Sequence, residues 1–583
     1  MLNEIKSIFV VKKIFGFLVK RKKMEILKCN KKLMHILNIE LNDFKNYISL
    51  KDLKQKYHLN IQENDINKIE TLEINSYSNI NKVLKYIKRI DFKALKNLDL
   101  RNNNINNLKI LINMKYENLE ILNLDENKIS DINALEKLSF PNLKCLLLRS
   151  NQIFNIDVLE KIGFKKLKEL YLKNNNIINI NILEKVKFEK LEILSLSKNK
   201  ISNINILEKV NFKDLKELYL DNNNISDIKV LEKVNFEKLE LLNLTNNKIS
   251  DINILETINF KELKKLGFGS NNISDIKVLE KVNFEKLELL YLTNNKISDI
   301  NVLEKVNFKD LKELYLDNNN ISDIKVLEKV NFEKLELLNL TNNKISDINI
   351  LETVNFKELK ELGFGGNGII EINILERVKS EKLEVLGLGA NEIIEINILE
   401  KVKYKNLKEL YLRNNNISDI KILENVEFEQ LEILSLSKNK ISDINVLEKV
   451  NFKELKELYL DNNNISDIKV LEKINFKELK ELYLDNNNIS DIKVLEKVVF
   501  EKLELLNLSK NKITDINVLE KVNFKELKKL YLQDNEIYNI RVFKRVKFEK
   551  LEVLNLTHHQ YYMANYFSDI IFELNSQIKE FYF

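Results

Sequence analysis

Residues 215–238 read LKELYLDNNNISDIKVLEKVNFEK, and residues 239–262 read LELLNLTNNKISDINILETINFKE. Both segments are 24 residues long, and the first leucine recurs at this spacing from Leu95 to Leu551 without an insertion or deletion, which gives 20 registers. Such a fixed period is typical of a stacked repeat architecture, because one short unit cannot bury its apolar side without neighbours above and below it. Positions within each unit are numbered from this leucine.

The first half of each unit alternates apolar and polar residues. Leu218 and Leu220 alternate with Glu217, Tyr219 and Asp221. This period of two predicts a short β-strand whose leucines point into the protein and whose other side chains point outward.

The second half of each unit predicts a turn and a short helical segment. Asp227 is placed to cap a helical or 3-10 piece over IKVLEKV, which begins at residue 228. The apolar residues of this piece and of the chain that follows are expected to return to the interior: Val230, Leu231, Val234 and Phe236.

The ninth position of the unit is asparagine in 19 of the 20 registers, from Asn103 to Asn535. An asparagine that faces an apolar interior is costly unless its amide is fully hydrogen-bonded. Stacked turns can supply those bonds from the backbones of adjacent units, so we expect a structural ladder of asparagines. His559 replaces the asparagine in the last register, which predicts that the ladder ends there.

The complete pattern, L-x-x-L-x-L-x-x-N-x-I followed by S-D-I-x-V-L-E-K-V-x-F, resembles the leucine-rich repeat family over roughly four fifths of the chain. The S-D-I segment is most similar to the short, internalin-like class, although this unit is longer. The resemblance implies an α/β repeat solenoid. In such a solenoid a parallel β-sheet lines the concave face, and short helical or 3-10 turns line the convex face.

The pattern also predicts four segments. Residues 95–556 hold the leucine-rich repeats, and residues 61–94 form a degenerate capping repeat in which Ile74 and Asn79 keep part of the motif. Residues 557–583 lose the repeat and are expected to form a C-terminal cap. Residues 1–60 do not repeat, and their apolar residues predict two or three short helices.

The order K-I-F-G-F-L, a short gap and C-N-K-K-L in this first segment is similar to an F-box, although the usual Leu-Pro opening and the final tryptophan are missing. The resemblance implies that residues 1–45 dock a cullin-ring adaptor through four apolar residues: Ile14, Phe15, Phe17 and Leu18. Two alternatives stay open. The segment is either a helical cap over the edge of the first strand, or a basic surface at residues 20–23 for a membrane or an acidic partner.

Charge and cysteine content narrow the class of protein. The net charge is +6, but residues 1–60 carry +9 and the rest of the chain carries −3, so the repeats are not expected to bind nucleic acid. Cys29 and Cys145 are the two cysteines, which favours a reducing, cytoplasmic location. The apolar stretch at residues 8–19 is interrupted by lysines and is too short to span a bilayer, so no transmembrane segment is expected.

One stretch resembles a cofactor motif. Residues 361–370 read ELGFGGNGII, in which Gly363, Gly365 and Gly368 spell G-x-G-x-x-G. A dinucleotide site requires a strand, a tight turn and then a helix N-terminus that faces the phosphates. The repeat register places no long helix after these glycines, so we expect no cofactor.

The same glycines nevertheless interrupt the repeat. Gly363 and Gly365 lie in one register, and Gly387 and Gly389 lie in the next. They replace tyrosine and aspartate, and we expect them to leave a shallow, bare strip on the strand surface. The glycines either result from sequence drift after duplication of the repeats, or they form a cleft where the backbone of a partner approaches closely.

The outward strand positions are the candidate partner-binding surface. Tyrosine at an interface offers a large contact area with few rotamers. Aliphatic residues and aspartates accompany the tyrosines in neighbouring units. The predicted contacts, besides the four glycines, are Tyr219, Tyr291, Tyr315, Tyr411, Tyr459, Tyr483, Asp221, Asp317, Asp461, Asp485, Leu241 and Leu337. The alternative is that these ladders of identical residues only stabilise the sheet.

Catalytic residues are scarce in this sequence. Four histidines occur, and the adjacent pair His558 and His559 would point in different directions from a strand, which makes a poor metal site. The sequence therefore predicts a non-catalytic protein-interaction scaffold that binds a protein on its concave face. A ubiquitin-ligase substrate receptor is the first alternative, and an enzyme is the second.

Overall fold

The computed structural model describes residues 68–583, apart from residues 75–79, 88–89, 91, 113, 115, 379, 547 and 559–566. The predicted helical segment at residues 1–60, its F-box-like contact with an adaptor and its basic surface lie outside the described residues and stay predictions. The chain divides into two compact units, Met1–Asn247 and Lys248–Phe583.

Unit 1 is a stack of short parallel strands, each followed by one helical turn. Neighbouring strands pair residue for residue, as Glu217 in β7 pairs with Leu241 in β8. The strands are β1 (Thr71–Glu73), β2 (Asn97–Asp99), β3 (Ile121–Asn123), β4 (Cys145–Leu147), β5 (Glu169–Tyr171), β6 (Ile193–Ser195), β7 (Glu217–Tyr219) and β8 (Leu241–Asn243). The helices are α5 (Ile80–Ile87), η3 (Leu108–Leu111), η4 (Asn133–Lys137), η5 (Asp157–Glu160), η6 (Asn181–Glu184), η7 (Asn205–Glu208) and η8 (Lys229–Glu232).

Unit 2 repeats the same arrangement, and its strands also pair in parallel. Its strands are β9 (Lys265–Gly267), β10 (Leu289–Tyr291), β11 (Glu313–Tyr315), β12 (Leu337–Asn339), β13 (Glu361–Gly363), β14 (Val385–Gly387), β15 (Glu409–Tyr411), β16 (Ile433–Ser435), β17 (Glu457–Tyr459), β18 (Glu481–Tyr483), β19 (Leu505–Asn507), β20 (Lys529–Tyr531), β21 (Val553–Asn555) and β22 (Glu580–Tyr582). Its helices are η9 (Asn253–Glu256), η10 (Lys277–Lys281), η11 (Asn301–Glu304), η12 (Lys325–Glu328), η13 (Asn349–Glu352), η14 (Asn373–Arg377), η15 (Asn397–Glu400), η16 (Lys421–Asn425), η17 (Asn445–Glu448), η18 (Lys469–Glu472), η19 (Lys493–Glu496), η20 (Asn517–Glu520), η21 (Arg541–Lys544) and α6 (Ser568–Gln577).

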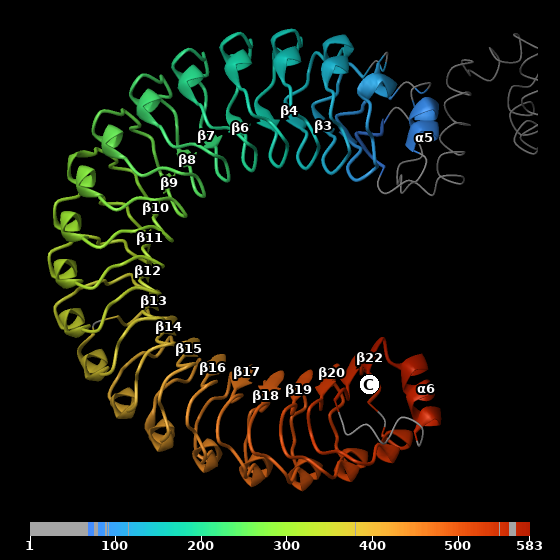
Figure 1. Ribbon diagram of the computed structural model, residues 1–583, viewed down its shortest axis with the longest axis vertical. Helices are drawn as coiled ribbons and strands as arrows, with labels where there is room; N and C mark the ends of the chain where they lie inside the picture. The colour runs from blue at the N-terminus through green and yellow to red at the C-terminus, as the bar shows by residue number, and fades with distance from the viewer. Residues whose placement is uncertain are drawn as a thin grey trace, which may run out of the picture. The chain divides into compact units, whose positions relative to one another are not determined.

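Within each unit the strands line the inner, concave side of the curve and the 3-10 turns line its outer, convex side (Figure 1). The predicted solenoid and its parallel sheet are therefore confirmed. These short helical turns are of the 3-10 type, because each N–H donates to the carbonyl three residues earlier. In η8, for example, Leu231 N–H donates to the Ile228 carbonyl at 3.0 Å. Asp227 acts as predicted, since its carboxylate accepts from Lys229 N–H at 2.9 Å.

The core of each unit consists of the periodic leucines. Leu218 and Leu220 are fully buried, and Leu231 and Phe236 from the second half of the unit close over them. Burial of one such side chain contributes about 1.5–3 kcal/mol, and only a stacked neighbour makes that burial possible. Val234 is the exception to the prediction, because it stays half-exposed.

The asparagine ladder is confirmed and its bonds are explicit. The side-chain amide of Asn319 donates to the Leu292 carbonyl of the preceding turn and to the Leu316 carbonyl of its own turn, both at 3.0 Å. Its side-chain oxygen accepts from Ile297 N–H at 3.0 Å. Each ladder asparagine of this type therefore connects two consecutive turns through buried polar groups.

The eighth position has a backbone requirement that the sequence reading missed. In all 20 registers, from Asn102 to His558, this residue has a positive φ between 51° and 64°. Asparagine tolerates this left-handed conformation better than most residues, which explains the recurring Asn-Asn pair at positions eight and nine. Gly366 satisfies the requirement without a side chain, whereas Ala390 adopts φ 54° with a Cβ.

Ordered helices and strands continue beyond the repeats at both ends. Before β2, the strand β1 and the eight-residue helix α5 precede Ile90 and Phe92, which are buried as the first turn of the stack. After β21, α6 packs Ile570 and Leu574 inward, and β22 adds one more parallel strand beside β21. Residues 61–94 thus contain an unexpected helix, and residues 557–583 extend the sheet. Among the described residues, neither α5 nor α6 has the length and the apolar run that a bilayer crossing needs.

We expect Asn319→Leu to destabilise the fold by about 1–3 kcal/mol, because buried backbone groups lose their partner. Local opening should follow, so hydrogen exchange at Ile297, whose N–H donates to Asn319, should accelerate. Asn301→Leu is the matched control, since Asn301 is exposed on η11. Unchanged exchange at Ile297 in the Asn319 variant would contradict a structural ladder.

We expect Ala390→Gly to stabilise the protein by about 0.5–1 kcal/mol. Removal of the Cβ from a left-handed residue relieves roughly 1–2 kcal/mol of strain, which exceeds the added entropy of the unfolded glycine. The control is Ala134→Gly in η4, a right-handed turn where glycine should instead destabilise by roughly 0.5–1 kcal/mol. Urea denaturation of both variants checks the opposite signs.

Candidate functional site

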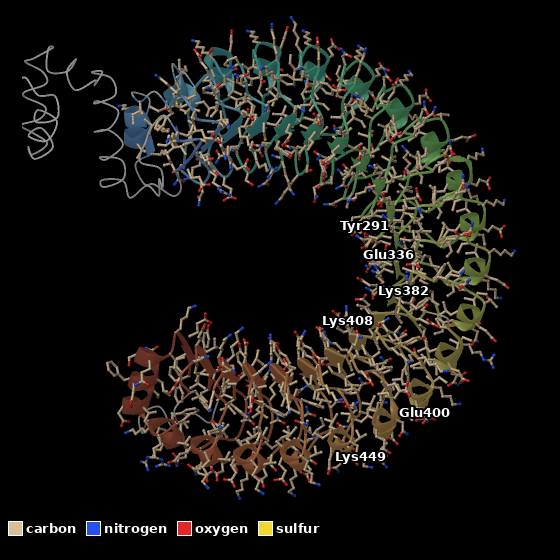
Figure 2. All side chains as sticks on the ribbon, turned by 180° about the vertical axis from the view of Figure 1, so that it is seen from behind. Tyr291, Glu336, Lys382, Glu400, Lys408 and Lys449 are labelled. Carbon is tan, nitrogen blue, oxygen red and sulfur yellow. The ribbon has the colours of Figure 1, made fainter. Side chains whose placement is uncertain are left out.

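The outward positions three, five and seven of the strands form the binding face, as we name it. The leucines at positions four and six point into the core, so these three positions share the concave side. Figure 2 shows Tyr291, at position five, on the inner side, whereas Glu400 and Lys449 lie on the outer side. The predicted tyrosines therefore lie on one face, but each ring is half-buried rather than fully exposed.

Five of the six predicted tyrosines are held by the glutamate two residues earlier on their own strand; Tyr291 follows Leu289 instead. The Tyr459 hydroxyl donates to the Glu457 carboxylate at 2.6 Å, and the Tyr483 hydroxyl donates to Glu481 at 2.8 Å. The same bond is formed by Tyr219, Tyr315 and Tyr411. Burial, and then the adjacent carboxylate, raises the pKa of these hydroxyls. The rings are thus fixed along the strands before any partner binds.

The structure brings two pairs of predicted tyrosines into contact. Tyr459 and Tyr483 stack with ring centroids 4.6 Å apart and planes 9° apart. Tyr291 and Tyr315 meet at 5.4 Å with a tilt of 59°. Tyr219 pairs with Ser195 and Asn243 in the neighbouring strands, so it has no aromatic neighbour at its own position.

The four predicted aspartates are of two kinds. Asp221 and Asp317 are buried, and their carboxylates accept from the hydroxyls of Ser197 and Thr293 in the preceding turn, both at 2.6 Å. These two aspartates therefore link turns and offer little surface to a partner. Asp461 and Asp485 are half-buried and remain open to the concave side.

Asp461 and Asp485 lie beside the stacked tyrosines in an open hollow of about 500 Å³ on β15–β19. Their donors are neutral groups. Asp461 accepts from the Asn462 amide at 2.7 Å and from the Ser437 hydroxyl, and Asp485 accepts from the Asn507 amide at 2.8 Å. Burial, followed by repulsion from Asp461, raises the pKa of Asp485 to about 6.

The predicted aliphatic residues alternate with glutamates along the sheet. Leu241 pairs in register with Glu217, and Leu337 lies between Glu313 and Glu361 of the adjacent strands. Both leucines are half-buried on the binding face. A partner would meet single aliphatic side chains between carboxylates, not a continuous apolar surface.

The predicted strip of bare glycines is only partly correct. Gly363 and Gly387 pair in register on β13 and β14 and are half-exposed, as is Gly389. Gly365 is buried, because the backbone packs so closely that an added Cβ would lie 3.1 Å from the Gly389 carbonyl oxygen. Gly269 is covered, because the Tyr291 ring lies over it, 2.2 Å from where a Cβ would be.

The G-x-G-x-x-G stretch has the context that the register predicted. Gly363 ends β13, Gly368 lies in the following turn, and the next helix, η14, has only five residues. The N-terminus of so short a turn does not supply the helix that a dinucleotide site requires after its glycines. Across the residues that the structure describes, no cluster of three histidine, cysteine or acidic side chains is placed to hold a metal ion.

One contact on this face was missed by the sequence reading. The Arg149 guanidinium lies over the Tyr171 ring, 4.0 Å from its centroid, and 3.8 Å from the Asp125 carboxylate. Arg149 occupies position seven, where other units carry aspartate, and this exchange was the available signal. The chain itself therefore shows a guanidinium held between a tyrosine and an aspartate of the binding face.

We expect Asp485→Asn to stabilise the protein by about 1–2 kcal/mol near pH 7.5. The folded protein holds the Asp485 proton more tightly than the unfolded chain, so this carboxyl favours the folded state at low pH and loses that contribution as the pH rises through about 6. The difference between variant and wild type should therefore vanish below about pH 4. Urea midpoints across this range check it, with the exposed Asp491→Asn as control. A variant less stable than wild type near pH 7.5 would contradict it.

Comparison with known proteins gives one family. The model described as "Leucine Rich repeats (2 copies)" matches residues 189–233, 285–329, 405–449, 429–473 and 453–497. No curated protein sequence matches the chain.

Solved structures of repeat proteins are similar to the chain. A leucine-rich repeat protein of Leptospira interrogans is 26% identical, with a TM-score of 0.53, over 73% of this chain and 100% of that protein. An internalin of Listeria monocytogenes is 27% identical, with a TM-score of 0.44, over 60% of this chain and 87% of that one. The Arabidopsis receptor kinase HAESA, solved with a peptide hormone and a co-receptor, is 20% identical, with a TM-score of 0.48, over 88% and 87%. The 24-residue units, the asparagine ladder, the family matches and the Leptospira structure together show that the chain is a leucine-rich repeat protein.

Proposed function

We propose that this protein is a non-catalytic scaffold that binds a protein partner on the binding face of its strands. The observation that carries the proposal is the Tyr459–Tyr483 stack beside an open hollow on β15–β19. Each ring is fixed by a hydroxyl bond to its own strand, so the tyrosine itself loses little rotamer entropy when a partner binds. Rigid aromatic anchors of this kind dominate the energetics of protein interfaces.

The charge of this face disfavours nucleic acid as the ligand. Position three of the tyrosine-bearing strands is repeatedly glutamate, as at Glu409, Glu457 and Glu481, and position seven adds Asp461 and Asp485. Phosphate backbones are bound by lysine and arginine, which these positions largely lack. A protein surface is the ligand class that fits aromatic side chains among carboxylates.

We further propose a reducing, cytoplasmic location. Cys145 is a free thiol that is buried in β4, where burial raises its pKa above the usual range. A thiol in this environment is a packing group and is slow to oxidise. Attachment of a glycan to the Asn-Ile-Ser sequence at residues 224–226, in protein purified from its source, would contradict this location.

We expect the double variant Tyr459→Ala, Tyr483→Ala to weaken partner binding by roughly 10- to 100-fold, because it removes both anchors of the hollow. The partner would first be isolated by unbiased pull-down with the full chain and mass spectrometry. Tyr538→Ala is the control, since Tyr538 is 64% exposed outside the strands. Its affinity should match that of the wild type.

The stability of the same variants separates binding from structure. The core leucines and the asparagine ladder are untouched, so the double variant should melt within a few degrees of the wild type. A large drop in melting temperature with partner binding intact would instead support the view that the tyrosines only stabilise the sheet.

A further inference from the structure

The binding face of unit 2 has a strong excess of negative charge. Among the outward positions of strands β11–β19, eight are acidic and one is basic. The acids are Glu313, Asp317, Glu361, Glu409, Glu457, Asp461, Glu481 and Asp485, and the base is Arg413. The chain after residue 60 carries only −3 in total, so the negative charge is concentrated on this face.

The lysines beside this face do not neutralise it. At position two, lysine and glutamate alternate from one unit to the next and form ion pairs with each other. Lys360 pairs with Glu336, Lys408 with Glu384 and Lys456 with Glu432, each at 2.6 Å. Over β11–β19 this ladder holds five lysines and four glutamates, the extra lysine being Lys480. It therefore offsets only one of the excess negative charges of the binding face.

The carboxylates of the face also repel one another. Burial first, and then repulsion from Glu409 and Glu313, raises the pKa of Glu361. The concave shape concentrates the field of these groups above the strands, which attracts a cation and accelerates its association. A positively charged partner is therefore favoured over a neutral or acidic one.

The hollow on β15–β19 combines this charge with a specific shape. Tyr411, Tyr459 and Tyr483 supply its aromatic walls. Its charged groups are the carboxylates of Glu457, Asp461 and Asp485 and the guanidinium of Arg413. A planar guanidinium can stack on tyrosine while its N–H groups bond to carboxylates, whereas a lysine ammonium is a compact point charge. Both kinds of contact are available here within one opening.

Unit 1 shows the same combination already occupied. There Arg149 stacks over Tyr171 and lies beside Asp125. Tyr171 has the same strand position as Tyr459 and Tyr483. In the hollow of unit 2 the carboxylates instead accept hydrogen bonds from neutral side chains of the chain itself. The residue that corresponds to Arg149, one unit before Tyr459, is Ser437. The arginine that does line the hollow, Arg413, comes from the unit before that one.

We propose that the hollow formed by Tyr459, Tyr483, Asp461 and Asp485 binds an arginine side chain from a basic segment of a protein partner. The inference rests on the proposed function, because it specifies which partner the same face selects. The guanidinium stacks against the tyrosines and replaces neutral donors at the two carboxylates, and further basic residues of the segment lie along the acidic strands.

The test uses the full chain and fluorescein-labelled peptides of three Gly-Ser-Arg repeats, with versions in which lysine or glutamate replaces arginine. Fluorescence anisotropy should show that the arginine peptide binds, that its affinity falls as salt is added, and that the glutamate peptide does not bind. The double variant Asp461→Asn, Asp485→Asn should lower the affinity for the arginine peptide at least about tenfold. The matched control is Asp467→Asn with Asp491→Asn, which removes the same charge from exposed positions of the same two units and should change nothing.

Several results would overturn the inference. These are equal binding of the arginine and glutamate peptides, an unchanged affinity in an Asp461/Asp485 variant that melts no lower than the wild type, or lysine binding as tightly as arginine. Failure of this inference differs from failure of the proposed function. A partner whose capture is lost with the Tyr459/Tyr483 variant, but whose bound segment is acidic or neutral, would leave the scaffold function standing and reject the arginine site.

Discussion

The hydrogen bonds of the ninth-position asparagine are the constraint on which the structure depends. One amide satisfies a carbonyl of its own turn, a carbonyl of the preceding turn and an N–H of that turn, as Asn319 does. A residue inserted into or deleted from any unit would shift this amide away from its partners and leave buried polar groups unsatisfied, at a cost of several kcal/mol. The invariant length of 24 residues follows from that cost.

This constraint leaves the outward positions free to vary. The leucines, the asparagine and the left-handed residue at position eight keep the turns in register, so positions three, five and seven can change without loss of the fold. Glycine, tyrosine, aspartate and arginine all occur there in otherwise similar units. A function that resides in these positions therefore needs no departure from the scaffold.

The periodic features could be predicted from the sequence because each unit repeats the same local evidence. The strands, the 3-10 turns, the buried leucines and the bonded asparagines were predicted in this way. Contacts between units could not be read so directly. Residues 215–228 and 455–468 are identical in sequence, yet Asp221 is buried and Asp461 is half-buried. The following turn differs, since Asn243 lies beside Tyr219 whereas Tyr483 lies beside Tyr459.

The candidate site arises where the alternation of the two unit types fails. Elsewhere a tyrosine-bearing unit is usually followed by one of the other type, but residues 455–478 and 479–502 are both tyrosine-bearing. This succession brings Tyr459 against Tyr483 and Asp461 beside Asp485, and it also places Lys480 next to Lys456, where the ladder would otherwise put a glutamate. Repulsion between the two aspartates and the interrupted ladder both disfavour this arrangement. A stacked pair of aromatic rings offsets part of that penalty, by about 0.5–1.5 kcal/mol. Local conflicts that a fold otherwise avoids are typical of functional surfaces, so the break itself supports the assignment of this site.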